Sequence, residues 1–213
     1  MKQFHSLIHK SDSQPQNEVL GISGSPRRNG NSDILLKNII AGLTQKNIPS
    51  ERVNLTNIQF QGCIGCERCR KDKICTGQID GMSVIYNRII SSKGLVLVCP
   101  THNYNITSWM KAFIDRLYCF YIFDKERPGT WSSQLAGQSR KAVIAAICEQ
   151  ENKEDMGFTI EAMKKPLKAL GYEIIGELSV FKTFHKGKVK QNEPAMEKAY
   201  ELGIKLGREI LKN

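Results

Sequence analysis

Four of the seven cysteines lie within thirteen residues in the pattern C-x2-C-x2-C-x5-C, running from Cys63 through Cys66 and Cys69 to Cys75. Structural zinc usually takes two separated C-x2-C pairs, and a redox dithiol needs only one pair. An iron–sulfur cluster commonly uses C-x2-C-x2-C, and Cys75 is free to complete a single site. The spacing therefore favours an iron–sulfur cluster in the cysteine loop, residues 61–80, with metal-free thiols as the alternative.

The local charge of the cysteine loop also suits an anionic centre. Residues 67–73 carry four basic and two acidic side chains, a local charge of +2. The other three cysteines, Cys99, Cys119 and Cys148, lie in apolar or aromatic stretches and are predicted to be packing residues. Seven is an odd number and no apolar signal region is seen near the start, so structural disulfides are not expected.

A second stretch rich in small and polar residues, GISGSPRRNGNS, occupies positions 21–32. An apolar run precedes this stretch, and apolar residues at helical spacing follow it. The free N–H groups and the positive dipole end at the start of a helix suit a phosphate. Gly24 and Gly30 would let the backbone approach a ligand closely. The predicted phosphate contacts are Ser23, Ser25, Arg27, Asn31 and Ser32. The stretch matches neither G-x-x-x-x-G-K-[ST] nor G-x-G-x-x-G, and an ordinary βα turn is the alternative.

Short apolar runs alternate with longer helical patterns along the chain, which indicates a parallel sheet covered on both faces. We predict strands at 18–22, 51–55, 94–100, 141–148 and 172–181, and helices at 31–43, 80–92, 106–120, 158–170 and 193–211. Five strands and five helices match an α/β flavodoxin-like three-layer sandwich with strand order 2-1-3-4-5. The predicted domain is 17–213, behind a polar tail at 1–16. Ligands are expected at the carboxyl ends of the strands, and we place the cysteine loop there too, beside them.

Composition excludes several classes of protein. Of the 213 residues 40% are hydrophobic and 24% are charged, and no apolar run approaches the roughly 18 residues of a membrane span. Without an apolar signal region near its start, the chain is expected in the cytoplasm. Its net charge of +10, from 31 basic and 21 acidic residues, suits anionic cofactors. Without a basic stripe interleaved with aromatics or a nucleic-acid motif, no nucleic-acid partner is predicted.

The stretch at 21–32 resembles the phosphate loop of the NADPH-dependent FMN reductase group of flavodoxin-like flavoproteins. PTHNYNITSWMKAFIDR, at 100–116, resembles the flavin-ring loop of that group and its K-x-F-x-D-R helix, and the whole resemblance runs from about residue 18 to residue 178. It implies FMN held without a covalent bond, with its phosphate at the first loop. The implied ring contacts are Pro100, Thr101, His102, Asn103, Tyr104 and Asn105, and Gln150 is a further one. Similar sequences often have an aromatic residue at position 102, and the loop 149–155 lacks the glycines common in them.

The cysteine spacing is similar to the compact motif of the iron–sulfur flavoproteins, a branch of the same flavin family. By that resemblance the four clustered cysteines hold one [4Fe-4S] cluster, although relatives often continue with an acidic pair where this chain has Asp80 and Gly81. The resemblance also implies a homodimer or homotetramer. The aromatic run 117–123, with Trp131 beyond it, is explained by core packing, whereas the resemblance favours a subunit interface.

These patterns together predict a flavin-dependent oxidoreductase that passes electrons between a reduced donor, with NAD(P)H as one possibility, and a one- or two-electron acceptor. Donor and acceptor are small molecules or proteins. No catalytic acid or base is predicted, because flavin chemistry belongs to the cofactor and the protein supplies orientation and electrostatics. Two alternatives stay open: an NAD(P)H-dependent FMN or quinone reductase without a cluster, and a non-catalytic flavin electron carrier.

Overall fold

A five-stranded parallel sheet forms the centre of the molecule in the computed structural model, which describes residues 16–124, 126 and 128–212. Its strands are β1 (Gln16–Ser23), β2 (Ser50–Asn54), β3 (Ser92–Pro100), β6 (Lys141–Ile147) and β7 (Glu173–Val180). The strands follow the order β2-β1-β3-β6-β7, and every neighbouring pair is parallel. Numbered by these five strands alone, this is the predicted order 2-1-3-4-5, so the flavodoxin-like fold is confirmed.

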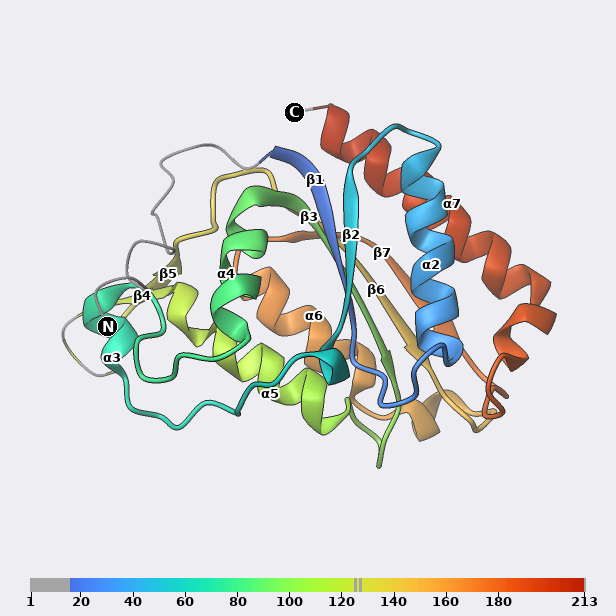
Figure 1. Ribbon diagram of the computed structural model, residues 1–213, viewed down its shortest axis with the longest axis horizontal. Helices are drawn as coiled ribbons and strands as arrows, with labels where there is room; N and C mark the ends of the chain where they lie inside the picture. The colour runs from blue at the N-terminus through green and yellow to red at the C-terminus, as the bar shows by residue number, and fades with distance from the viewer. Residues whose placement is uncertain (1–15, 125, 127, 213) are drawn as a thin grey trace.

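Helices cover both faces of the sheet (Figure 1). One face carries α2 (Asn31–Thr44) and α7 (Glu193–Leu211), and the other carries α4 (Met82–Ser91), α5 (Ser108–Arg116) and α6 (Thr159–Ala169). Successive residues of β3 enter different cores: Leu95 and Leu97 pack with α4–α6, whereas Val96 and Val98 pack with α2 and α7. Because both faces are covered, the central strands β3 and β6 are buried almost throughout instead of alternating.

Short elements complete the described chain. They are the helix α3 (Arg68–Asp72), the 3-10 turns η1 (Leu55–Asn57), η2 (Leu117–Phe120), η3 (Lys153–Met156) and η4 (Lys188–Gln191), and the strands β4 (Tyr121–Phe123) and β5 (Trp131–Ser133). The predicted helix 106–120 therefore ends at Arg116, and the chain turns into an antiparallel hairpin of β4 and β5 that periodicity did not predict. Aromatic rings join its strands, with Tyr121 and Trp131 edge to face at 5.2 Å.

The cysteine loop leaves the carboxyl end of β2 and extends beside the helices to the β4–β5 hairpin (Figure 1). There the Arg70 Nη2 donates to the carbonyl of Asp124 at 2.8 Å, and the guanidinium lies 4.9 Å from the ring centre of Phe123. The Gln134 Nε2 donates to the carbonyl of Lys73 at 3.0 Å. The sequence predicts this loop beside the ligand site at the sheet edge, whereas these contacts hold α3 at the hairpin.

Two further predictions concern the ends of the chain and the membrane. β1 begins at Gln16, and the remainder of the predicted tail, 1–15, lies outside the described residues. Within the described ranges, no helix has the length and apolar character needed to cross a bilayer.

Candidate functional site

A pocket of about 360 Å³ opens at the carboxyl ends of β1, β3, β6 and β7. Its lining residues are Ser25, Pro26, Arg27, Asn31, Ser32, Pro100, Thr101, His102, Asn103, Ile147, Glu149, Thr183 and Phe184. Eight of the twelve residues predicted to bind the cofactor are among them. A pocket at the switch point of an open α/β sheet is the usual ligand site of such a fold, and its volume is that of a small-molecule site.

The phosphate end of this pocket is the start of α2. No side chain caps this helix at Gly30, so its first-turn N–H groups and positive dipole end face the loop. A Cβ at Gly30 would lie 2.8 Å from the carbonyl oxygen of Arg27, so the tight turn here requires glycine. The buried Ser25 Oγ accepts from the Arg27 N–H at 3.2 Å and shapes the same turn. The loop is therefore a cradle for an anion.

Arg27 fixes the side of the pocket formed by the loop after β7. Its Nη1 donates to the carbonyl of Phe184 at 3.0 Å, and its guanidinium lies 4.5 Å from the ring centre of Phe184. Partial desolvation and the positive charge of Arg27 lower the pKa of His102, on the opposite wall, below its ordinary value. His102 is therefore a neutral imidazole at pH 7 in the structure described.

Arg27→Ala should raise the pKa of His102, because one of the two causes of its depression is the Arg27 charge. Desolvation, the larger cause, should keep part of the depression in the variant. NMR titration of the His102 imidazole in ligand-free protein measures both values. A wild-type pKa at or above about 6.5, or one that Arg27→Ala leaves unchanged, would contradict this assignment.

The side-chain amide of Asn31 bonds to the segment after β7, and its contact with a phosphate stays a prediction. Its Nδ2 donates to the carbonyl of His185 at 3.0 Å, and its Oδ1 accepts from the Val189 N–H at 3.2 Å. Both ends of the amide are thus used to hold the segment 184–189 beside α2. The side chain of Asn31 positions Phe184 at the pocket, and this role depends on a contact that local sequence does not encode.

The predicted ring loop is a tight turn in which His102 and Asn105 exchange both backbone hydrogen bonds, at 2.8 and 3.0 Å. Asn103 and Tyr104 both have positive φ, at 46° and 60°, as a type I′ turn requires. The Tyr104 carbonyl accepts from the Phe158 N–H at 2.8 Å. A Cβ at Gly157 would lie 2.2 Å from that carbonyl, so only glycine allows this approach. The start of α6 therefore fixes the shape of the turn.

Thr107 joins the two predicted cofactor loops. Its hydroxyl donates to the carbonyl of Gly24 at 2.7 Å and accepts from the Met110 N–H at 3.2 Å, which caps α5. Gly24 in turn donates to the carbonyl of Val98 at 2.9 Å. One buried hydroxyl therefore sets the phosphate loop and the ring loop at a fixed separation.

Four predicted residues do not line the pocket. Ser23 is buried and donates to Asp33 Oδ1 at 2.6 Å, on the side of a separate polar hollow. Tyr104 and Asn105 lie in the turn with exposed side chains. Gln150 is exposed, and its carbonyl accepts from the Lys182 N–H at 3.0 Å. Their contacts with a cofactor stay predictions.

The lining residues that sequence analysis missed are Pro26, Ile147, Glu149, Thr183 and Phe184. Four of them lie at or after the carboxyl ends of β6 and β7. Parallel strands end at one edge of their sheet, so the loops after the last two predicted strands were the available signal.

A second cavity, of about 410 Å³, is lined by all four clustered cysteines, together with Asp115 and Tyr118 at the end of α5. Cys63 and Cys66 are exposed, whereas Cys69 and Cys75 are half-buried. Burial, followed by the neighbouring Cys75 and Cys63, raises the pKa of the Cys69 thiol to about 11. A Cβ at Gly77 would lie 2.3 Å from the Cys66 Sγ, so a larger residue at 77 would require that exposed thiol to turn away.

The thiols surround the cavity instead of converging on one point. Across the described part of the chain, no three His, Cys, Asp or Glu side chains are arranged to hold a single metal ion. In a [4Fe-4S] cluster each thiolate binds a different iron atom, so its ligands surround a volume. Four thiols that line one cavity are the donor set that a [4Fe-4S] cluster takes.

The cofactor pocket and the cysteine cavity have no lining residue in common. Thr107, which caps α5, is bonded to the phosphate loop, whereas Asp115 and Tyr118 at the other end of α5 line the cysteine cavity. Nine helical residues span about 13 Å, which is the order of the distance between the two ends of α5.

The model of one family, NADPH-dependent FMN reductase, matches residues 17–149, which include the phosphate loop, the cysteine loop and the ring loop. The chain belongs to this family. The match to the NADPH-dependent FMN reductases extends over more than half of the sequence and begins one residue into β1.

Several curated relatives of this chain are named iron–sulfur flavoproteins. One from Methanocaldococcus jannaschii is 29% identical over 99 residues, which are 46% of this chain and 51% of that protein. One from Archaeoglobus fulgidus is 27% identical over 189 residues, 89% of this chain and 78% of that protein. The chain thus spans about half the length of the first relative and most of the second.

Solved structures show the same fold as this FMN reductase family member. An FMN-dependent NADH-azoreductase from Bacillus anthracis, solved in complex with FMN, matches 90% of this chain and 100% of its own with a TM-score of 0.65 and 19% identity. An NAD(P)H:quinone oxidoreductase from Methanothermobacter marburgensis matches 90% of this chain and 99% of its own, with a TM-score of 0.63 and 15% identity. At these identities the likeness supports the fold alone.

Proposed function

We propose that the protein is a flavin-dependent oxidoreductase that binds FMN in the pocket at the carboxyl edge of the sheet. The observation that carries the proposal is the uncapped start of α2, with Ser25 and Arg27 beside it, opening on a pocket of about 360 Å³. Bound FMN would supply hydride and single-electron chemistry. In this chain α2 would hold its phosphate, and the His102–Asn105 turn would orient its ring.

We further propose that the four cysteines of the second cavity hold one [4Fe-4S] cluster. The cavity they line and the proteins named iron–sulfur flavoproteins among the relatives support this assignment. A cluster exchanges one electron at a time, whereas a flavin exchanges one or two. The pair would therefore connect a reduced two-electron donor with a single-electron acceptor.

The alternative within the same class is an NAD(P)H-dependent FMN or quinone reductase whose cysteines hold no metal, and membership of the NADPH-dependent FMN reductase family supports it. A non-catalytic electron carrier is the alternative from another class. A homodimer or homotetramer and a cytoplasmic location stay predictions.

We expect anaerobically purified protein to release FMN, identified by mass spectrometry, and to contain about four iron atoms per chain, as one [4Fe-4S] cluster requires. Steady oxidation of NADH or NADPH with a quinone would separate an enzyme from a carrier. A colourless protein that ignores added FMN would refute the first proposal. Protein that releases FMN but contains no iron would support the alternative, a reductase without a cluster.

A further inference from the structure

The side chain of Arg116, the last residue of α5, is almost fully buried, with 1% of its area exposed. Its Nη1 donates to the Gln61 carbonyl at 2.8 Å and to Asp80 Oδ2 at 2.7 Å, and its Nη2 donates to Asp80 Oδ1 at 3.1 Å. Its Nε donates to the Tyr86 hydroxyl at 3.1 Å. Gln61 and Asp80 are the two ends of the cysteine loop, so one guanidinium binds both.

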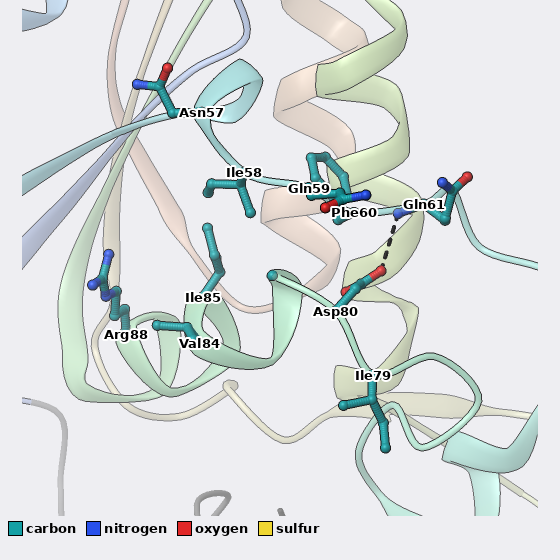
Figure 2. A pocket seen from close by; sticks show the side chains of 11 residues that line it. Asn57, Ile58, Gln59, Phe60, Gln61, Ile79, Asp80, Val84, Ile85 and Arg88 are labelled. Carbon is teal, nitrogen blue, oxygen red and sulfur yellow. Dashed lines mark hydrogen bonds between the residues drawn. The ribbon is translucent and has the colours of Figure 1, made fainter.

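Further bonds cross between the same two ends. The Gln61 N–H donates to Asp80 Oδ2 at 3.1 Å, as Figure 2 shows, and the Gln78 Nε2 donates to the Gly62 carbonyl at 2.8 Å. The Gly81 N–H donates to the Gln59 carbonyl at 3.0 Å. These bonds close a neck immediately before Cys63 and a few residues after Cys75.

The neck holds the first limb of the loop, which has little burial of its own, whereas the contacts of Arg70 and Gln134 hold α3 at the hairpin. All residues from 61 to 68 are exposed, including Cys63 and Cys66. Burial acts to raise the pKa of Asp80, but the hydrogen bonds from Arg116 and from two backbone N–H groups outweigh it and hold that pKa below its ordinary value. Asp80 is therefore an anion at neutral pH, and its bond to Arg116 is a charge-assisted, two-point contact.

We propose that the Arg116–Asp80 pair positions the cysteine loop by fixing the separation of its two limbs, so that Cys63 and Cys75 face one cavity. Neither residue is proposed as a metal ligand, because both act through the backbone of the loop. The proposal deepens the assignment of the cysteines to a cluster and rests on it.

The test uses two variants that keep the local fold. Asp80→Asn removes the charge but keeps a side-chain oxygen that can accept from the Met82 N–H at the start of α4, as Asp80 Oδ1 does at 3.0 Å. Arg116→Lys keeps the charge but loses the two-point contact. Residues that orient metal ligands typically change metal affinity by about 10- to 100-fold, and we expect iron retention against a chelator to fall by about tenfold or more in each variant. FMN content should not change.

The matched control is Arg140→Lys. Arg140 is equally buried, at 1% exposed, and donates to the carbonyls of Ile89, Ser92 and Ile90 at the other end of α4. This variant should lower stability to a comparable extent while iron retention matches the wild type. Equal iron loss in Arg140→Lys and the two neck variants would mean that Arg116 affects iron only through overall stability, and it would overturn the proposal.

Hydrogen exchange of iron-free protein tests the neck independently of the cluster. Amides at 62–79 should exchange about tenfold faster or more in Asp80→Asn and Arg116→Lys, in proportion to the opening of the neck, and should match the wild type in Arg140→Lys. Unchanged exchange and unchanged iron retention in both neck variants would overturn the proposal. Faster exchange in a protein whose wild type never holds iron would uphold the neck and refute the cluster instead.

Discussion

Cys66→Ser should remove most of the iron from anaerobically purified protein and leave FMN bound. A cluster needs its four thiolates together, so the loss of one ligand degrades the whole centre. Cys66 lies in the cavity that the other three cysteines line, and that cavity has no lining residue in common with the cofactor pocket. Iron analysis and flavin absorbance of the same sample measure both results, and single-electron transfer to an external acceptor should fall with the iron.

Cys148→Ser is the matched control for this substitution, because it makes the same chemical change at a buried position outside the cavity. Cys148 is 2% exposed and packs in the core between the sheet and α4–α6. Its replacement should cost stability, as burial of a polar group does, and should leave iron untouched. Wild type without iron, indistinguishable from Cys66→Ser in every assay, would refute the cluster and leave a metal-free FMN reductase.

Ser25→Ala combined with Arg27→Ala should weaken FMN far more than riboflavin, which lacks the phosphate. A charge-assisted hydrogen bond contributes about 1.5–3 kcal/mol, so loss of Arg27 alone should raise the Kd of FMN by about tenfold or more. Arg27 also holds Phe184, and loosening that wall should affect both flavins. The difference between FMN and riboflavin therefore isolates the phosphate contact.

Arg28→Ala is the control for the Arg27 substitution. Arg28 is the next residue, is exposed, and does not line the pocket. The Arg28→Ala substitution removes the same charge as Arg27→Ala, so any general electrostatic attraction for FMN is lost equally in these two variants. Fluorescence titration of the wild type and of each variant with the two flavins gives the dissociation constants. Equal losses for FMN and riboflavin in the Arg27 variant would mean that the loop does not hold the phosphate.

Local sequence was enough to predict the five sheet strands and the five long helices in their order along the chain, because each element depends on the spacing of apolar residues within one segment. It also placed the stretch 21–32 between the first strand and the first long helix, since a βα turn is a local feature. The boundaries were less exact: the helix predicted to end at 120 ends at Arg116, where the chain turns toward the hairpin.

Tertiary structure alone decided which side chains share a site. Thr107 bonds to Gly24 across 83 residues, Arg27 to Phe184 across 157, and Arg116 to Asp80 across 36. No periodicity encodes such pairs, because they follow from the order of the strands and the packing of helices on them. The same holds for Ser23, whose donation to Asp33 on the first helix turns it away from the pocket, and for the cysteine loop, which α3 carries to the β4–β5 hairpin.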